Sequence, residues 1–392
     1  MRPVTRAALV PLLAALSACA SGVGSTPPGG REDHAAPMIA SVTPDTGTTN
    51  FKGKEMTVEF DEVIGERPST GATLADVVLI SPRDGQPEVD WHRRRITIRP
   101  RNKWRPDMAY TVTIRPGITD LRNNVRNTTT EILFSTGSVI PKTTVAGRIF
   151  DWVTGLPARN GIVEVVARND TTLVYFGVVD STGAFALRGI RPASYLVRGY
   201  IDDNHNLGFD PRESFDTTGI TLADSARLEL LAFLHDSTGP SIGIVATRDT
   251  NTVHVTFDSP IDPSWQPTPT AFRVVGPDSA VIPIVAVTAD RPDTTTKTLP
   301  PRPLNSSLPP RPVAPTTARD TTRPRPSKPL LYRGVTITLG ARLHPRGQYT
   351  LHAYNVRAPG GIVRTSERSF TVPAELPRQD AGRRDTTATP RR

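Results

Sequence analysis

The sequence is poor in cysteine, with Cys19 as the single one among 392 residues. No disulfide can therefore form within the chain, and no Cys-x-x-Cys pair is available to bind zinc. Aromatic residues reach only 6% and hydrophobic residues 37%, which predicts that part of the chain stays unfolded. The high proline content, 39 residues against 29 glycines, favours small β modules joined by extended segments.

Signatures of catalysis and of cofactor binding are also scarce. The sequence contains no His-Glu-x-x-His, no phosphate-binding P-loop and no Gly-x-Gly-x-x-Gly, so it lacks the common metalloprotease and nucleotide motifs. The seven histidines are scattered and do not suggest a zinc site. We therefore expect no enzyme activity and no cofactor, apart from the calcium considered below.

The charge balance is basic, with 47 Lys and Arg against 38 Asp and Glu and a formal net charge of +9. Such a balance suits nucleic acid, anionic envelope polymers or lipid headgroups, or it serves only solvation. Residues 290–329 hold eight Lys or Arg against three Asp, so this stretch carries +5 of the total. We expect envelope components rather than nucleic acid as partners.

The first nineteen residues have the pattern of an export signal. A short basic segment precedes the apolar run 7–16, which is too short to span a bilayer. Leu16-Ser17-Ala18-Cys19 resembles a bacterial lipobox. The resemblance implies that residues 1–18 are a signal peptide and that Cys19 becomes lipidated and acylated. Two or more acyl chains anchor a protein stably, whereas one binds only marginally.

The alternative is an ordinary secretory signal cleaved after Ala18 or Ala20, which would leave Cys19 without a role. The residue after the cysteine is Ala20 rather than Asp, and in lipoproteins of two-membrane bacteria this favours the outer membrane. Residues 19–36 are rich in Gly, Ser, Thr and Pro and predict a flexible tether.

The fold class predicted for the rest is all-β, with tandem antiparallel Ig-like β-sandwiches and disordered Pro/Thr-rich segments. Residues 37–138 contain short alternating strands separated by turns. This stretch resembles the bacterial Ig-like domain of S-layer and envelope proteins. Tyr110 lies where the resemblance implies a tyrosine corner. The matching residues are 58–61, 104–112, 118–120, Asn123, Asn124 and 134–137.

Residues 142–236 predict a second sandwich. The turn Asp180-Ser181-Thr182-Gly183-Ala184-Phe185, followed by 190–195 in the pattern Ile-x-Pro-x-x-Tyr, resembles the carboxypeptidase regulatory, transthyretin-like domain. That resemblance implies a β-sandwich without a catalytic role.

Residues 239–373 repeat the pattern of the first module. Val253 to Asp258 matches 56–61, and 343–351 matches 104–112. The register is restored once residues 290–329 are removed, so these form a disordered, basic insertion with eleven prolines. The tail 374–392 is again polar and predicts disorder.

The best candidate binding site is the stretch from Asp202 to Glu213. Side-chain oxygens fall at relative positions 1, 3, 5, 9 and 12, the spacing of a calcium loop. Leu207 stands where such a loop has glycine, and no flanking helix is visible, so a purely structural turn is the alternative. The candidate ligands are Asp202, Asn204, Asn206, Asp210 and Glu213.

Taken together, the sequence predicts a non-catalytic, lipid-anchored envelope protein that presents its modules for binding or scaffolding. Its expected partners are the membrane, through the lipid, and peptidoglycan, glycans or other envelope proteins. The alternative is a carbohydrate-binding lipoprotein of a nutrient-uptake or polysaccharide-degradation system.

Overall fold

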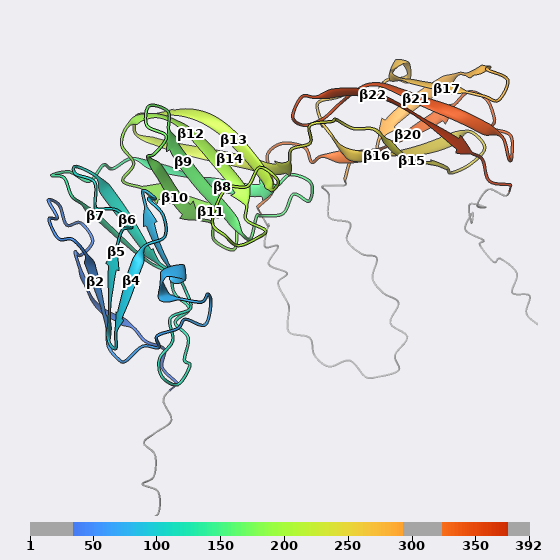
Figure 1. Ribbon diagram of the computed structural model, residues 1–392. Coiled ribbons are helices and arrows are strands. Elements are labelled where there is room, and N and C mark those ends of the chain that lie inside the picture. The colour runs from blue at the N-terminus through green and yellow to red at the C-terminus, as the bar shows by residue number, and fades with distance from the viewer. Residues whose placement is uncertain (1–33, 293–323, 375–392) are drawn as a thin grey trace, which may run out of the picture.

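In the described residues, alternating apolar and polar side chains give a regular secondary structure that is almost entirely β, which confirms the predicted fold class. The computed structural model describes residues 34–292 and 324–374, and Figure 1 shows their strands in three groups. In β2 (Met56–Phe60) every second side chain is buried, as the two-residue period of a strand requires.

Helix is almost absent from the described residues. The two helices there are short 3₁₀ turns, η1 (Leu74–Val77) and η2 (Pro269–Ala271). Neither is long or apolar enough to cross a membrane. Cys19, the signal 1–18 and most of the tether 19–36 lie outside the described residues.

The first module is a sandwich of two antiparallel sheets, with strand orders β1-β2-β5-β4 and β3-β6-β7. Val58, Ile98 and Val112 lie fully buried between the sheets. The remaining bounds are β1 (Ile39–Thr43), β3 (Val78–Ser81), β4 (Glu88–His92), β5 (Arg95–Arg99), β6 (Ala109–Ile114) and β7 (Thr130–Ser135).

The second module is a curved seven-stranded sheet with the order β10-β9-β12-β13-β14-β8-β11. Its outer strands β10 and β11 lie close together, so the sheet folds over its own core. β8 and β14 pair in parallel, which the long connection between them permits. The bounds are β8 (Thr144–Asp151), β9 (Gly161–Ala167), β10 (Val174–Val178), β11 (Ala184–Arg188), β12 (Ala193–Ile201), β13 (Ser214–Leu222) and β14 (Ser225–Leu234).

The third module has the sheets β15-β16-β20-β19 and β18-β17-β21-β22, the same arrangement as the first with β18 added. The sequence insertion lies between β19 and β20, where the first module has only the tight turn between β4 and β5. The bounds are β15 (Ile242–Thr247), β16 (Thr252–Ile261), β17 (Phe272–Val275), β18 (Val281–Ile282), β19 (Ile284–Ala289), β20 (Tyr332–Leu339), β21 (Gln348–Arg357) and β22 (Val363–Thr371).

Equivalent hydrogen bonds recur in the two repeats. The Asp61 carboxylate accepts from the Met38 amide at 2.8 Å, and Asp258 accepts from the Ser241 amide at the same distance. Tyr110 caps its loop by accepting from the Arg105 amide at 2.7 Å, the local role that its resemblance implies. The repeated sequence pattern therefore produces repeated local structure.

The first and second modules share one continuous hydrophobic core. The Arg83 amide donates to the Val174 carbonyl at 2.7 Å, and the Phe176 amide donates to Ser81 Oγ at 3.0 Å. These bonds join β3 of one module to β10 of the next, so the joint is built from backbone as well as side chains.

The third module has a core of its own, and the segment before β20 connects it to the second module. Ser327 donates to the Glu229 carboxylate through both its amide and its hydroxyl. The Trp152 indole donates to the Pro329 carbonyl at 2.9 Å, and Lys328 lies 6.0 Å from the Trp152 ring. The described end of the insertion is thus docked on the second module.

Candidate functional site

The predicted calcium loop is the connection between β12 and β13. These strands pair in antiparallel register, with Tyr200 opposite Phe215. Asp202 follows β12 and Glu213 precedes β13, so the register brings the two carboxylates to the neck of the loop. Both are buried, at 3% and 6% exposure. The strands therefore supply the spatial closure that helices would supply in a helix-loop-helix site.

The first half of the loop is held by its own side chains. The Asp202 carboxylate accepts from the amides of Asn206 at 3.1 Å and Leu207 at 3.0 Å. Asn204 Oδ1 also accepts from the Asn206 amide, and Asn206 Oδ1 accepts from the Gly208 amide at 2.6 Å. The short polar side chains thus set the turn, as Asp and Asn commonly do.

The second half ends in Glu213, which reaches back across the loop. Its Oε1 accepts from the amides of Asp203 at 3.0 Å and Asn204 at 3.4 Å. Its Oε2 is buried and has no hydrogen-bond partner. Asp210 turns its carboxylate to the Arg212 amide instead. The structure therefore brings the Asp202 and Glu213 carboxylates to the neck. Asn204 and Asn206 bond to amides inside the loop, and Asp210 is directed to the Arg212 amide.

Leu207 adopts the backbone conformation that glycine usually provides in such loops. Its φ of 58° is left-handed, which costs a residue with a Cβ about 1–2 kcal/mol. Its side chain packs against the small cluster of Ile162, Phe176 and Tyr200. This packing offsets the strain, so leucine is accommodated at this left-handed position.

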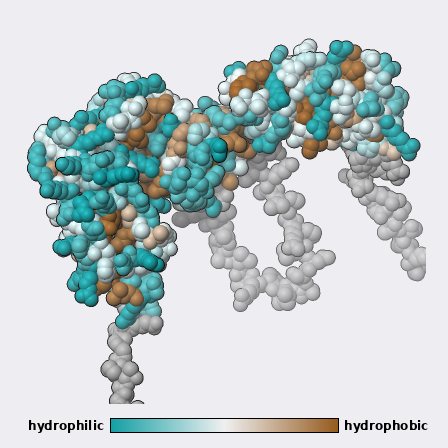
Figure 2. Space-filling model, in the orientation of Figure 1, coloured by the Kyte–Doolittle hydropathy of each residue, from teal (hydrophilic) through white to brown (hydrophobic). Residues whose placement is uncertain are grey.

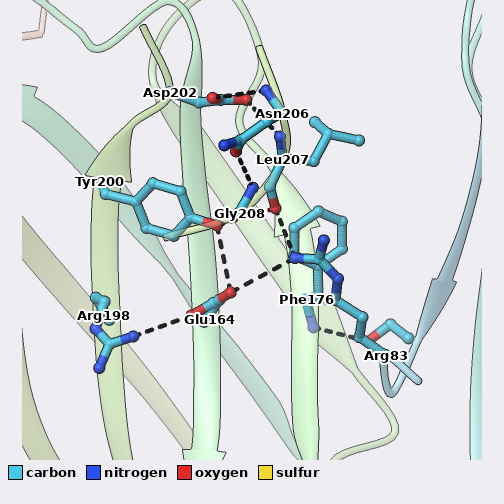
Figure 3. A network of polar contacts seen from close by, with 10 residues as sticks. Arg83, Glu164, Phe176, Arg198, Tyr200, Asp202, Asn206, Leu207 and Gly208 are labelled. Atoms are coloured by element: carbon cyan, nitrogen blue, oxygen red, sulfur yellow. Dashed lines mark hydrogen bonds and ion pairs between the residues drawn. The ribbon is translucent and has the colours of Figure 1, made fainter. Parts of the chain in front are cut away.

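A buried ionic network lies beneath the loop (Figure 3). Glu164 on β9 is 7% exposed and contacts Arg198 at 3.3 Å and Arg83 of the first module at 3.7 Å. Arg83 also donates to the Leu207 carbonyl at 2.6 Å, and so does the Tyr200 hydroxyl at 3.2 Å. The loop is therefore attached to both modules at their joint.

Tyr200 is a hydrogen-bond donor in this network. Burial, together with the nearby Glu164 carboxylate, raises the pKa of Tyr200 far above its usual value. Its hydroxyl consequently keeps its proton and can donate toward Glu164 at 3.3 Å as well as toward Leu207. The Leu207 carbonyl is thus fixed by two donors of this network, Arg83 and Tyr200.

Within the described residues, no three His, Cys, Asp or Glu side chains converge as metal ligands. The predicted set instead combines two buried carboxylates with two amide oxygens. The absence of a carboxylate trio is consistent with Asp210 facing away from the neck.

The sequence also contains one motif that occurs in hydrolases. Gly239-Pro240-Ser241-Ile242-Gly243 has the form Gly-x-Ser-x-Gly, which in hydrolases marks a serine on a strand-to-helix elbow. Here Ser241 directly precedes strand β15, and its hydroxyl donates to Asp258 at 2.6 Å. Only the amide bond from Ser241 to Asp258 recurs in the first module, as Met38 to Asp61. The serine therefore lies at the start of a strand and not on a nucleophile elbow.

A hollow of about 260 Å³ lies between the second and third modules, lined in part by Phe233, His235, Pro260 and Pro359. The His235 ring is stacked on Phe215 at 3.8 Å and on Phe233 at 4.0 Å. Its faces are therefore covered and do not offer a platform for a sugar ring. On the visible surface, hydrophobic residues form several separate areas (Figure 2).

Solved structures with some likeness to this chain include the N-terminal part of the bacterial S-layer protein SbsC, at 14% identity and a TM-score of 0.20. That match covers 49% of this chain and 44% of SbsC. An L,D-transpeptidase from Mycobacterium smegmatis has 12% identity, coverages of 51% and 77%, and a TM-score of 0.20. The major pilin subunit of Bacillus cereus has 8% identity, coverages of 51% and 71%, and a TM-score of 0.19.

With TM-scores this low, none of the three structures informs the function of this chain. The chain spans less than half the length of the S-layer structure. No curated protein sequence matches it. The match that carries weight is to a family model: residues 33–136, which contain the first sandwich, match the bacterial Ig-like domain.

Proposed function

We propose that this chain is a non-catalytic, lipid-anchored protein of the bacterial cell envelope that presents its β modules for binding or scaffolding. The observation that supports it best is the construction of the joints. The first two modules share a core, and the third is attached through Ser327 and Pro329. A shared hydrophobic core fixes the first two modules relative to each other, and the bonds of Ser327 and Pro329 tie the third module to them.

The anchor is proposed from the lipobox-like residues before Cys19, which favour an outer-membrane lipoprotein. Mass analysis of the mature N-terminus from intact cells tests it. We expect a diacylglyceryl group on Cys19 and loss of membrane attachment in Cys19→Ser. A mature chain starting after Ala20 without lipid would contradict the anchor.

The scaffolding role predicts stable neighbours in the envelope, including peptidoglycan or other surface proteins. The basic residues between 293 and 323 are the proposed contact with anionic polymer. Replacing Lys297, Arg302, Arg311, Arg319 and Arg323 by Gln keeps the length of the chain and the docked segment 324–331. We expect weaker retention on purified cell wall at low salt, because screened ionic contacts carry the binding. Unchanged retention would contradict this part of the proposal.

A glycan array separates the carbohydrate-binding alternative from the scaffolding role. Scaffolding on anionic polymer predicts salt-sensitive binding with little sugar preference. Saturable, salt-insensitive binding to one sugar class would favour the alternative.

A further inference from the structure

We propose that the hairpin loop from Asp202 to Glu213 binds one calcium ion, with Glu213 as its anchoring ligand. The inference concerns a different site from the lipid anchor and does not depend on it. It rests on the buried, unpartnered oxygen of the Glu213 carboxylate, on the charge of the loop and on the side-chain oxygens within it.

Glu213 is more than nine-tenths buried, and its Oε2 is shielded from solvent without a hydrogen-bond partner. A buried carboxylate oxygen left in this way is costly, because it has lost its water and gained nothing in return. The other oxygen of the same carboxylate accepts from two loop amides. The carboxylate is therefore aimed into the loop, and a cation there would satisfy it.

The charge of the loop favours a cation as well. Asp202, Asp203, Asp210 and Glu213 face a single Arg212 in the same stretch. In the described part of the chain, the ion pairs near this site join Arg83 and Arg198 to Glu164 and do not reach these four carboxylates. None of the four carboxylates forms an ion pair within the described residues, so amides are their only charge-stabilising partners there.

The loop offers hard oxygen donors of the kind calcium prefers. Carboxylate and amide oxygens carry two lone pairs each. Asp202, Asn204 and Asn206 use their side-chain oxygens for bonds from loop amides, which leaves further lone pairs for an ion. Position 9 of a calcium loop often acts through water, which agrees with Asp210 facing the Arg212 amide.

Binding at this loop would stiffen the joint between the first two modules. The Leu207 carbonyl, in the middle of the loop, accepts from Arg83 of the first module. An ion that fixes the loop therefore fixes the acceptor of this inter-module bond. Calcium is expected to reduce protease cleavage at the joint in the unaltered protein and to have a smaller effect in Arg83→Ala.

Isothermal titration of the metal-free full chain with calcium tests the site. Cys19→Ser in every sample prevents lipidation without touching the described residues. We expect one site with a Kd on the order of 10⁻⁴–10⁻³ M, the range of extracellular modules. Glu213→Gln should weaken binding at least tenfold, because it keeps the shape and the amide contacts but removes the charge.

Asp236→Asn is the matched control, since Asp236 caps an exposed turn through Thr238 and lies outside the loop. Its calcium affinity should equal that of the unaltered protein. Terbium luminescence sensitised by Tyr200, whose hydroxyl contacts the loop, provides a second measurement that needs no variant. The proposal is overturned if the unaltered protein binds neither ion at about 10 mM, tenfold above the weakest expected Kd. It is also overturned if a folded Glu213→Gln binds calcium equally well.

Discussion

Two tyrosines in equivalent positions of the repeated sandwich close the same local loop. Tyr110 accepts from the Arg105 amide at 2.7 Å, and Tyr349 accepts from the His344 amide at 2.8 Å. Each ring also stacks on the phenylalanine of the neighbouring strand, Phe134 or Phe370. A buried ring with one fixed hydroxyl bond thus closes, in both repeats, the loop that precedes a strand.

Replacing either tyrosine by phenylalanine should cost about 1 kcal/mol of unfolding free energy, because an amide loses its partner while the ring stays packed. Urea unfolding of Tyr110→Phe and Tyr349→Phe measures this. Tyr354→Phe is the control, since this half-exposed side chain should change stability by less than about 0.5 kcal/mol. Equal effects in all three variants would show that the hydroxyl bonds have no special role.

Asp180 illustrates how a turn residue sets the acid stability of the second module. Burial tends to raise its pKa, but hydrogen bonds from Thr182 and Ala184 outweigh burial and lower the pKa below 3.8. A depressed pKa means that the carboxylate contributes stability above its ordinary pKa and loses it as the pH falls. Asp180→Asn should therefore narrow the difference in stability between pH 7 and pH 3. Urea unfolding at both values tests this, and an unchanged difference would contradict it.

At the scale of elements, the parallel pair β8–β14 depends on a residue without a side chain. A Cβ on Gly147 would lie 2.1 Å from the Leu228 carbonyl oxygen and 2.8 Å from the Phe185 ring. The backbones of these strands therefore approach each other closely at this point. Glycine in a strand often marks such an approach.

Gly147→Ala should destabilise the second module by about 1–3 kcal/mol, the usual cost of overpacking. Thermal unfolding followed by circular dichroism measures it. Gly360→Ala is the matched control, because a Cβ there meets nothing within 4 Å and should be neutral or slightly stabilising. A harmless Gly147→Ala would mean that β14 can shift away from β8.

At the scale of the molecule, the cores predict two cooperative units. The first and second modules share one core, and the third has its own. Domains with a continuous core unfold together, whereas separate cores give separate transitions. Calorimetry should show two transitions, the larger belonging to residues 34–236.

The matched variants Ile98→Ala and Ile337→Ala assign these transitions. Both side chains are fully buried at equivalent positions of β5 and β20. Each variant should lose about 2–5 kcal/mol of unfolding free energy. Ile98→Ala should lower the transition temperature of residues 34–236 only, and Ile337→Ala that of the third module only. If Ile98→Ala lowered the transition temperature of the first module while that of the second stayed unchanged, the two modules would not unfold as one cooperative unit.

Calcium should act on the first of these units. A calcium concentration a hundredfold above the Kd stabilises the folded protein by about 2.7 kcal/mol. The transition temperature of residues 34–236 should therefore rise, and it should fall back when the calcium is chelated. The third module provides the internal control and should not respond. A rise confined to the third module would place the ion elsewhere.

The sequence alone was enough to predict the all-β class, because a strand's period of two shows directly in residues such as Met56, Val58 and Phe60. The bacterial Ig-like character of the first module could be predicted in the same way from local motifs. Residue spacing also identified the loop from Asp202 to Glu213, since its candidate ligands are close together in the chain.

Only the tertiary structure decided how distant residues meet. Arg83 bonds to Leu207, and Ser327 docks on Glu229, across long stretches of chain that no local sequence pattern relates. The unpartnered oxygen of Glu213 likewise depends on how the surrounding segments bury it. Leu207 departs from the glycine of the calcium-loop pattern, and only its packing shows what holds its left-handed backbone. Local patterns determine which strands form, whereas burial and long-range hydrogen bonds determine which strands and loops touch.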